Sequence, residues 1–423
     1  MTTTTFSPGG RSVLRDLAFL RLWSGTTASG LATWALPFVL GLAVLDRTLT
    51  AAGLGIVLAA RTVGFLAAVP VAGVLADRYS RRAVVLWSGL AAALATPFIA
   101  LGLGRSVLLM AAAAAVAGAG QGACRPAFQA LTAEIVHPER RHQANAAITL
   151  AVRVTTLVAP AGTALLAVVM DTWSLLVAIA LLWLVAALLP PRGVPVRDAG
   201  EAGRSKGFGV GELVREFGEG AREARRHPWF LAGLAALAAV IFTGYSATGV
   251  ALPLVSRDSY GSEAVLAAAL TAYTLGAIVG AVLMSRWKPR SQGWAALAGL
   301  ALYGLAPLSL LLPAHPALVF AAYALAGLGI ELFNVPWFTA TQREVEPRLL
   351  ARVSSLDFLV SYGLAPVGLA FLAPAMDAFG WQPVLAVCAL VCFLAPAAAA
   401  LTPSSRHFSA ARETSPDRPV TEG

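Results

Sequence analysis

The stretch Gly73-Val-Leu-Ala-Asp77-Arg78-Tyr-Ser-Arg81-Arg82 decides the fold, because it places four charged side chains in a short segment between two long apolar runs. An apolar run of roughly 20 residues is long enough to cross a lipid bilayer as an α-helix. A short charged turn between two such runs therefore predicts two membrane helices joined by a tight connection. We expect this connection on the cytoplasmic side.

Composition extends this interpretation to the whole chain. Hydrophobic residues make up 58% and charged residues 13% of the 423 residues, whereas soluble proteins contain about 45–50% and about 25%. This composition excludes a soluble protein of ordinary fold. The apolar runs predict twelve spans, at residues 20–45, 51–76, 83–104, 106–131, 144–169, 173–190, 229–254, 264–285, 293–313, 317–341, 353–375 and 383–401.

The positive charges alternate along the chain. Only Arg47, Arg105 and Arg257 fall in every second loop, whereas the intervening segments hold most of the other arginines. Lys and Arg accumulate in cytoplasmic loops, so both termini are predicted in the cytoplasm and the protein in the cell membrane. The net charge of +9 is thus explained by membrane topology rather than by nucleic-acid binding.

The chain contains an internal repeat. Pro126-Ala-Phe128 and Ala159-Pro160-Ala-Gly162 in the first half are matched by Pro336-Trp-Phe338 and Ala365-Pro366-Val-Gly368 in the second. The fold class predicted is therefore an all-α membrane protein with two pseudo-symmetric six-helix bundles. Pro160 and Pro366 are expected to kink their helices. The predicted domains are bundles at 1–190 and 229–402, a cytoplasmic linker at 191–228 and a disordered cytoplasmic tail at 403–423.

The linker leaves two interpretations open. Its second part, Glu212 to Pro228, has helical spacing with apolar residues on one face. It is either an amphipathic helix at the membrane surface, with arginines attracted to anionic lipid, or a partly disordered charged linker.

The stretch from Gly73 to Arg82 resembles the signature between helices 2 and 3 of the major facilitator superfamily, with Ser80 in place of its second glycine. Phe19-Leu-Arg21-Leu-Trp23 and Arg225-Arg-His-Pro228 resemble the twelve-span drug-efflux branch, near the macrolide-efflux-like and enterobactin-exporter-like proteins. The resemblance implies a monomeric secondary transporter that exports small amphipathic solutes by alternating access, driven by the proton gradient. The alternative is an importer, a lipid-handling protein or a sensor on the same fold.

The resemblance also implies a latch at the inner ends of the helices. Asp77 would meet the start of helix 11, Arg81 would reach Glu134, and Gly73 would let helices 2 and 11 approach closely. The other interpretation, a set of solvated charges that only fix topology, suits Arg78 better than Asp77.

Charged residues inside spans are candidates for function, because each costs about 2.5–3.5 kcal/mol to insert at mid-span. Glu331 either couples transport to protons, recognises a cationic solute, or pairs with a buried arginine. Arg61 is either a packing residue between helices 2 and 11 or a substrate contact. Arg125 and Asp357 lie closer to a membrane surface. The candidate coupling or buried charges are Arg61, Arg153, Glu331 and Asp357.

Helices 1, 4, 7 and 10 line the cavity in the architecture that the resemblance implies. Each hydroxyl could equally bond to its own helix backbone. Helix 4 departs from the proton-coupled pattern, since Gly118-Ala-Gly-Gln121 carries glycine where an arginine is usual. The candidate cavity-lining residues are Thr33, Trp34, Gln121, Thr243, Tyr245 and Asn334.

Nothing in the sequence points to an enzyme. The five histidines lie in loops or at helix ends, and no phosphate-binding Gly-x-x-x-x-Gly-Lys-Ser/Thr motif is found. We expect no cofactor, no metal site and no catalytic residues.

Overall fold

The computed structural model describes residues 12–193, 210–311 and 315–409, and these are helical almost throughout. Eleven helical segments are long and apolar enough to cross a membrane, and the shorter apolar helix α6 (Thr172–Leu188) supplies a twelfth. The prediction of an all-α membrane protein with twelve spans is confirmed.

The first half forms one bundle, which we call the amino-terminal bundle. Short turns η1 (Val13–Arg15) and η2 (Pro138–Arg140) precede its first and fifth spans. The remaining helices besides α6 are α1 (Leu17–Leu45), α2 (Ala51–Arg78), α3 (Arg81–Gly102), α4 (Val107–Ile135) and α5 (Arg141–Leu166).

The second half forms the carboxy-terminal bundle, and two of its spans are interrupted. The seventh span contains a π-helical turn, and the ninth contains a 3-10 turn. The elements are α9 (Pro228–Ala239), η3 (Val240–Tyr245), α10 (Ser246–Asp258), α11 (Ala264–Arg286), α12 (Gln292–Ala301), η4 (Leu302–Gly304), α13 (Leu305–Leu311), α14 (Pro316–Glu344), α15 (Leu350–Phe379) and α16 (Trp381–Ala400).

Side-chain caps start several helices at the ends of the apolar runs. Ser80 is extended, with φ −87° and ψ 124°, and its side chain accepts a hydrogen bond from Ala83 N. Such a cap satisfies one of the free N–H groups of the first turn. Because the backbone here is not left-handed, serine fits where the resembling signature carries glycine. Other caps of this kind are Thr50, Ser106 and Asp171.

Close glycine contacts hold corresponding helix pairs together in the two bundles. A Cβ on Gly118 of α4 would overlap the carbonyl of Arg61 on α2. A Cβ on Gly327 of α14 would likewise overlap the carbonyl of Tyr273 on α11. Small residues allow membrane helices to approach this closely, and their presence in both pairs agrees with the internal repeat.

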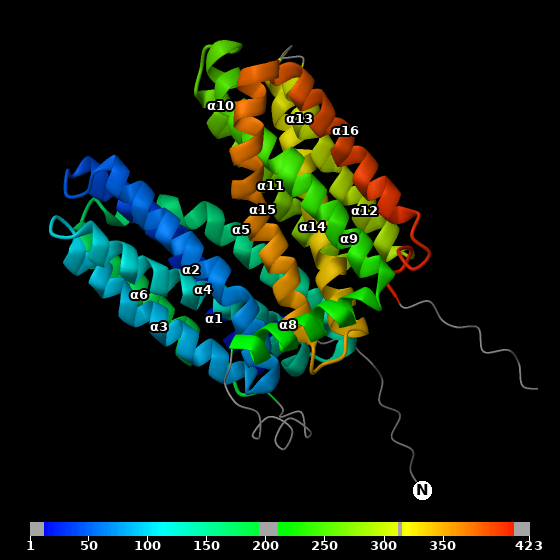
Figure 1. The fold of residues 1–423 in the computed structure, drawn as a ribbon, viewed down its shortest axis with the longest axis horizontal. Helices are drawn as coiled ribbons and strands as arrows, with labels where there is room; N and C mark the ends of the chain where they lie inside the picture. Colours follow the sequence, from blue (N-terminus) through cyan, green and yellow to red (C-terminus); the bar gives the residue numbers. More distant parts are fainter. Residues whose placement is uncertain (1–11, 194–209, 312–314, 410–423) are drawn as a thin grey trace, which may run out of the picture.

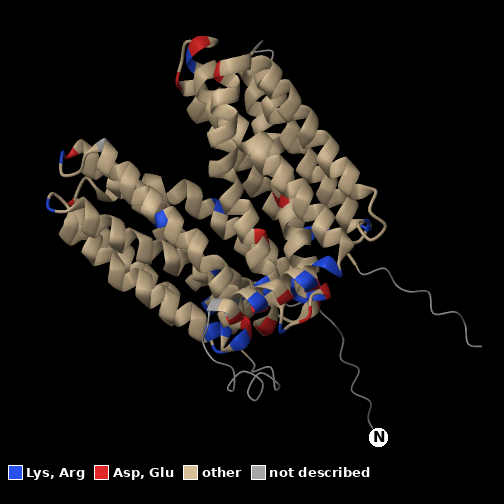
Figure 2. Cartoon of the chain, viewed as in Figure 1, with Lys and Arg blue, Asp and Glu red and all other residues tan. Residues whose placement is uncertain are grey.

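The two bundles lie against each other at one end and diverge toward the other (Figure 1). The helix α8 (Val210–Arg225) lies at the end where they meet, which we call the α8 end. Most charged residues gather there, and few lie along the spans (Figure 2). The chain is thus polar at the α8 end and apolar over the length of the bundles.

Part of the linker and part of the tail are folded. The linker helix forms as α8, whereas residues 194–209 lie outside the described residues. Residues 403–409 are not disordered, contrary to the prediction: Phe408 is 0% exposed and its ring lies 5.3 Å from that of Trp229. The aromatic contact explains the difference. Residues 410–423 lie outside the described part.

Candidate functional site at the interface between the bundles

Asp77, near the end of α2, contacts the first turn of α15 in the other bundle. Its Oδ1 accepts a hydrogen bond from Ala351 N at 3.0 Å, and its Oδ2 accepts one from Arg352 N at 2.9 Å. The first turn of a helix has free N–H groups and a partial positive charge. The carboxylate therefore satisfies two of these donors and neutralises the helix end.

Gly73 lies one turn before Asp77 on the same face of α2. A Cβ at this position would lie 2.7 Å from Ser355 Oγ and 2.9 Å from Ala351 O. These distances are shorter than van der Waals contact, so α2 and α15 can only lie this close because residue 73 has no side chain.

Arg81 lies beside this contact at the start of α3. Its Nη1 lies 3.4 Å from Glu134 Oε1 and 3.3 Å from Ala130 O, both near the end of α4. Its Nη2 donates to the carbonyl of Pro347, which belongs to the other bundle, and lies 3.8 Å from Asp77 Oδ1. One guanidinium thus joins the carboxylates of α2 and α4 to the loop before α15.

Helix α8 contacts both bundles through its glutamates. Arg352 donates to Glu219 at 2.8 Å and to Glu216 at 3.1 Å, while Arg78 lies 3.8 Å from Glu216. Arg78 is therefore buried in an ion pair rather than solvated. Glu216 and Glu219 of α8 thus face the protein. The arginines that face outward on this helix are Arg215, Arg222 and Arg225.

The start of α5 makes a second contact with the other bundle, through α11 and α14. His142 Nε2 lies 2.6 Å from Met284 O. Arg141 donates to the carbonyl of Gln342 at 2.7 Å, and Asn145 donates to its side chain at 3.0 Å. The sequence analysis missed Gln342. The polar residues that both halves carry at the inner ends of their helices would have been the signal.

Arg153 and Glu331 form an ion pair between the bundles near the middle of α5 and α14. The Glu331 side chain is 0% exposed, and its Oε2 also accepts a hydrogen bond from Asn334 at 3.3 Å. Of the interpretations left open for Glu331, the contacts correspond to pairing with a buried arginine.

Arg61 points into its own bundle. Its Nη2 donates to Thr33 O at 3.0 Å and to Gln121 Oε1 at 2.7 Å. These partners lie on α1 and α4, so Arg61 does not pack between the second and eleventh spans as the resemblance favoured. Arg125, further along α4, lies with its guanidinium carbon 5.6 Å from the ring centre of Tyr362 on α15.

Asp357 is buried near the start of α15, and no ion pair joins it to a described residue. Its Oδ1 has no hydrogen-bond partner among the described residues. It therefore differs from Glu331, whose carboxylate is paired with an arginine.

The other candidate residues occupy separate places. Thr243 donates to its own helix at Ala239 O, 2.7 Å away, within the π-helical turn η3, and Tyr245 ends that turn with 52% of its surface exposed. Trp34 is 38% exposed on α1. α5 and α15 continue through their prolines. The proposed roles of Thr33, Trp34, Gln121, Thr243, Tyr245 and Asn334 in lining a cavity, and of Pro160 and Pro366 as kinks, stay predictions.

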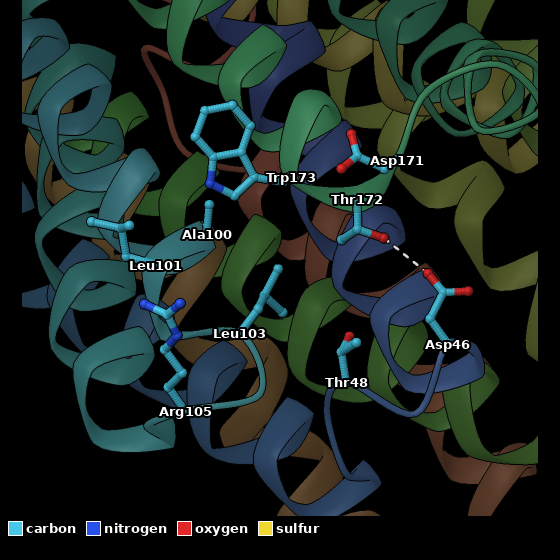
Figure 3. Close-up of a pocket in the computed structure, with 9 residues that line it drawn as sticks. All are labelled: Asp46, Thr48, Ala100, Leu101, Leu103, Arg105, Asp171, Thr172 and Trp173. Carbon is cyan, nitrogen blue, oxygen red and sulfur yellow. Dashed lines mark hydrogen bonds between the residues drawn. The ribbon is translucent and has the colours of Figure 1, made fainter.

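A pocket of about 370 Å³ lies away from all these residues, where three loops meet at the far end of the amino-terminal bundle (Figure 3). Asp46 accepts a hydrogen bond from Thr172 at 3.0 Å across its rim (Figure 3). Its lining also includes Arg105, Asp171 and Trp173. It does not reach the interface between the bundles.

Comparisons with known proteins agree with this fold. A family model described as Major Facilitator Superfamily matches residues 22–368 and 236–422. None of the curated protein sequences matches the chain.

Two solved structures illustrate the likeness. The crystal structure of the human organic anion transporter MFSD10 (TETRAN) is 18% identical, with a TM-score of 0.71, over 92% of this chain and 100% of that one. The transporter FucP in the outward conformation is 16% identical, with a TM-score of 0.68, over 90% of this chain and 98% of that one. At these identities the likeness establishes the fold alone.

Proposed function

The chain belongs to the major facilitator superfamily, and on this premise we propose that it exports small amphipathic solutes by alternating access. The observation that carries the proposal is where the bundles touch. Among the described residues, the hydrogen bonds and ion pairs between the bundles lie at the Arg153–Glu331 pair or between it and the α8 end.

The contacts at the α8 end are of a kind that can be broken and remade. A carboxylate against a helix N-terminus is stabilised in contact, and water can replace its partners when the ends separate. A transporter that alternates between two states needs contacts present in only one of them. The structure therefore represents the state in which the α8 end is closed.

The basic loops at the α8 end support its assignment to the cytoplasm. With this orientation, the closed α8 end corresponds to a state that communicates with the outside. A cysteine replacing Arg225, which is exposed on α8, should react with an impermeant thiol reagent only after the membrane is permeabilised. Reaction in intact cells would contradict the orientation.

We propose proton coupling through Asp357 in preference to Glu331. Glu331 is held by Arg153 and Asn334, and an ion pair keeps a carboxylate charged. Asp357 is buried without an ion-pair partner among the described residues. A buried carboxylate of this kind is stabilised by binding a proton, because its charge is costly in an apolar environment.

Cross-linking the α8 end tests alternating access. Gln342 donates to Gln129 Oε1 across the interface at 2.9 Å, so Gln129→Cys and Gln342→Cys should accept a short reducible cross-linker. The background lacks Cys124, Cys388 and Cys392. Asp46→Cys with Thr172→Cys, which lie within one bundle at 3.0 Å, is the matched control.

Transport is measured in proteoliposomes with two dyes that share a xanthene core, anionic carboxyfluorescein and cationic rhodamine 6G, with and without a pH gradient. Cross-linking the first pair should stop transport of whichever dye is carried, and reduction should restore it. The control pair should have no effect. Transport that continues through the cross-linked α8 end would contradict alternating access.

A further inference from the structure

Five charged residues lie within the spans, four of them well away from the helix ends and Asp357 seven residues into α15. Arg61 is ten residues into α2, and Arg125 is ten residues before the end of α4, so each lies about 15 Å from the nearer end of its helix at 1.5 Å per residue. The remaining three are Arg153, Glu331 and Asp357.

These charges do not balance. Glu331 neutralises Arg153, and Asp357 forms no ion pair with a described residue. No carboxylate among the described residues lies within ion-pair distance of Arg61 or Arg125. An arginine in the bilayer interior costs several kcal/mol unless its charge is compensated. Two positive charges at this level of the protein therefore lack counter-charges.

The two uncompensated arginines lie close together. Arg61 reaches Gln121 on α4 at 2.7 Å, and Arg125 follows Gln121 by four residues, which places it one turn along the same face. The two charges are near enough to repel each other. One anionic group with two oxygens, placed beside both guanidinium groups, would compensate both charges.

Aromatic residues of both bundles lie at the Arg125 side of this pair. The ring of Tyr362 on α15 lies beside Arg125 and is 37% exposed, and the ring of Phe65 on α2 lies 5.0 Å from it. Tyr362 is also within electrostatic range of Arg153. The site thus combines two guanidinium groups with aromatic surface at the interface that changes during transport.

We infer that Arg61 and Arg125 bind the anionic group of the transported solute, an amphipathic organic carboxylate or sulfonate. This inference rests on the proposed transport function, because it places the solute between the bundles. Guanidinium groups suit the task, since their planar donors match two oxygens of a carboxylate. Gln121 holds Arg61 in place, and the rings of Phe65 and Tyr362 contact the apolar part of the solute.

The competing explanation is structural. Arg61 would then serve only to join α1, α2 and α4 through Thr33 and Gln121, and Arg125 only to stack on Tyr362. Under this explanation the two arginines would stabilise the protein, and the charge of a bound molecule would not matter.

Equilibrium binding separates the two explanations without requiring transport. The protein is placed in nanodiscs of zwitterionic phosphatidylcholine, and the fluorescence anisotropy of carboxyfluorescein and rhodamine 6G is titrated. The variants are Arg61→Gln, Arg125→Gln and their combination, with Arg61→Lys and Arg125→Lys as versions that keep the charge. Arg257→Gln, an exposed arginine at the far end of α10, is the matched control.

The wild type should bind carboxyfluorescein more tightly than rhodamine 6G. Each Gln variant should weaken anion binding at least about tenfold, as expected for hydrogen bonds to a charged group. The Lys variants should lose less, because they keep the charge but not the planar donors. The control should bind as the wild type does, and rhodamine 6G affinity should not fall in any variant.

The inference is overturned if the wild type does not bind carboxyfluorescein, or if the double variant binds it unchanged. If the Gln variants do not fold, equal binding of both dyes by the folded Lys variants overturns it as well. Selective anion binding by a protein whose cross-linked α8 end still permits transport would instead overturn the proposed function. Cross-link-sensitive transport with a preference for the cationic dye would overturn the anion site alone.

Discussion

The bundles meet along two contacts that differ in chemistry. Between α2 and α15, the Asp77 carboxylate accepts hydrogen bonds from the first turn of α15, and Arg81 donates to the carbonyl of Pro347 before this helix. Glu216 of α8 pairs with Arg352 beside this contact. Between α5 and its neighbours α11 and α14, hydrogen bonds at the α8 end continue into the buried pair of Arg153 and Glu331 at mid-span.

This difference indicates which contact opens more easily. The partners of Asp77 lie at the end of the bundles, where water can hydrate them once the ends separate. Arg153 and Glu331 lie in the apolar interior, where separating two charges is costly. We therefore expect the contact between α2 and α15 to act as the latch, and the Arg153–Glu331 pair to persist while it opens.

The largest effect is expected from Glu331→Gln, which leaves the charge of Arg153 buried without its partner. Removing one member of a buried ion pair costs about 3–5 kcal/mol. The amount of folded protein extracted from the membrane should fall strongly, as measured by fluorescence-detected size-exclusion chromatography. A double variant, Arg153→Met with Glu331→Leu, should recover much of it.

Recovery of folded protein in the double variant would show that the loss comes from the unpaired charge of Arg153. If Glu331→Gln gives normal amounts of protein but loses only gradient-driven transport, then Glu331 couples transport to protons and does not serve as a permanent partner of Arg153. If the amount of protein and transport both stay normal, the pair has neither role.

A smaller but specific effect is expected from Asp77→Asn. The amide can still accept a hydrogen bond from the first turn of α15, but it lacks the charge that favours the helix end. Bonds to a charged group are worth about 1.5–3 kcal/mol, so the α8 end should open at least about tenfold more often. Transport should slow at matched membrane levels.

Opening can be measured with a buried cysteine. Ser355 is 0% exposed and lies against Gly73 at the contact between α2 and α15. In a cysteine-free background, alkylation of Ser355→Cys should be about tenfold faster with Asp77→Asn, because the reaction follows the open population. Asp258→Asn, an exposed residue at the other end, should leave it unchanged. An unchanged rate with Asp77→Asn would exclude the latch.

The spans could be predicted from sequence because length and hydropathy are local properties. The interruptions of the seventh and ninth spans at η3 and η4 could not, since neither stretch contains a proline that would mark a break in the helix. Disorder of residues 403–409 was inferred from the lack of an apolar period. The buried ring of Phe408 and the hydrogen bonds from Arg343 to the carbonyls of His407 and Phe408 hold this stretch against the carboxy-terminal bundle.

The partners of charged residues depend on how distant segments pack. Arg153 and Glu331 are 178 residues apart, and Arg352 and Glu216 are 136 residues apart. The sequence indicated that the buried charges needed partners, but it gave no pairing. The sequence predicted that Arg125 lies closer to a membrane surface, and only the packing of α15 places it at the interface between the bundles.

The smallest effect is expected from Glu216→Gln in α8. This change removes the ion pairs of Glu216 with Arg352 and Arg78, but Arg352 keeps Glu219 at 2.8 Å. The loss should therefore stay at about 1 kcal/mol, because the glutamine side-chain oxygen can still accept a hydrogen bond from Arg352. Alkylation of Ser355→Cys should be about threefold to fivefold faster, which is a smaller increase than with Asp77→Asn.

Glu212→Gln provides the matched control, because it removes the same charge from the same helix. Glu212 pairs with Arg215 within α8 and not with either bundle. If α8 stabilises the latch through the specific ion pairs of Glu216, Glu212→Gln should leave the alkylation rate unchanged. If both substitutions raise the alkylation rate equally, α8 acts through its overall charge, and the contact between α2 and α15 does not depend on a specific ion pair from α8.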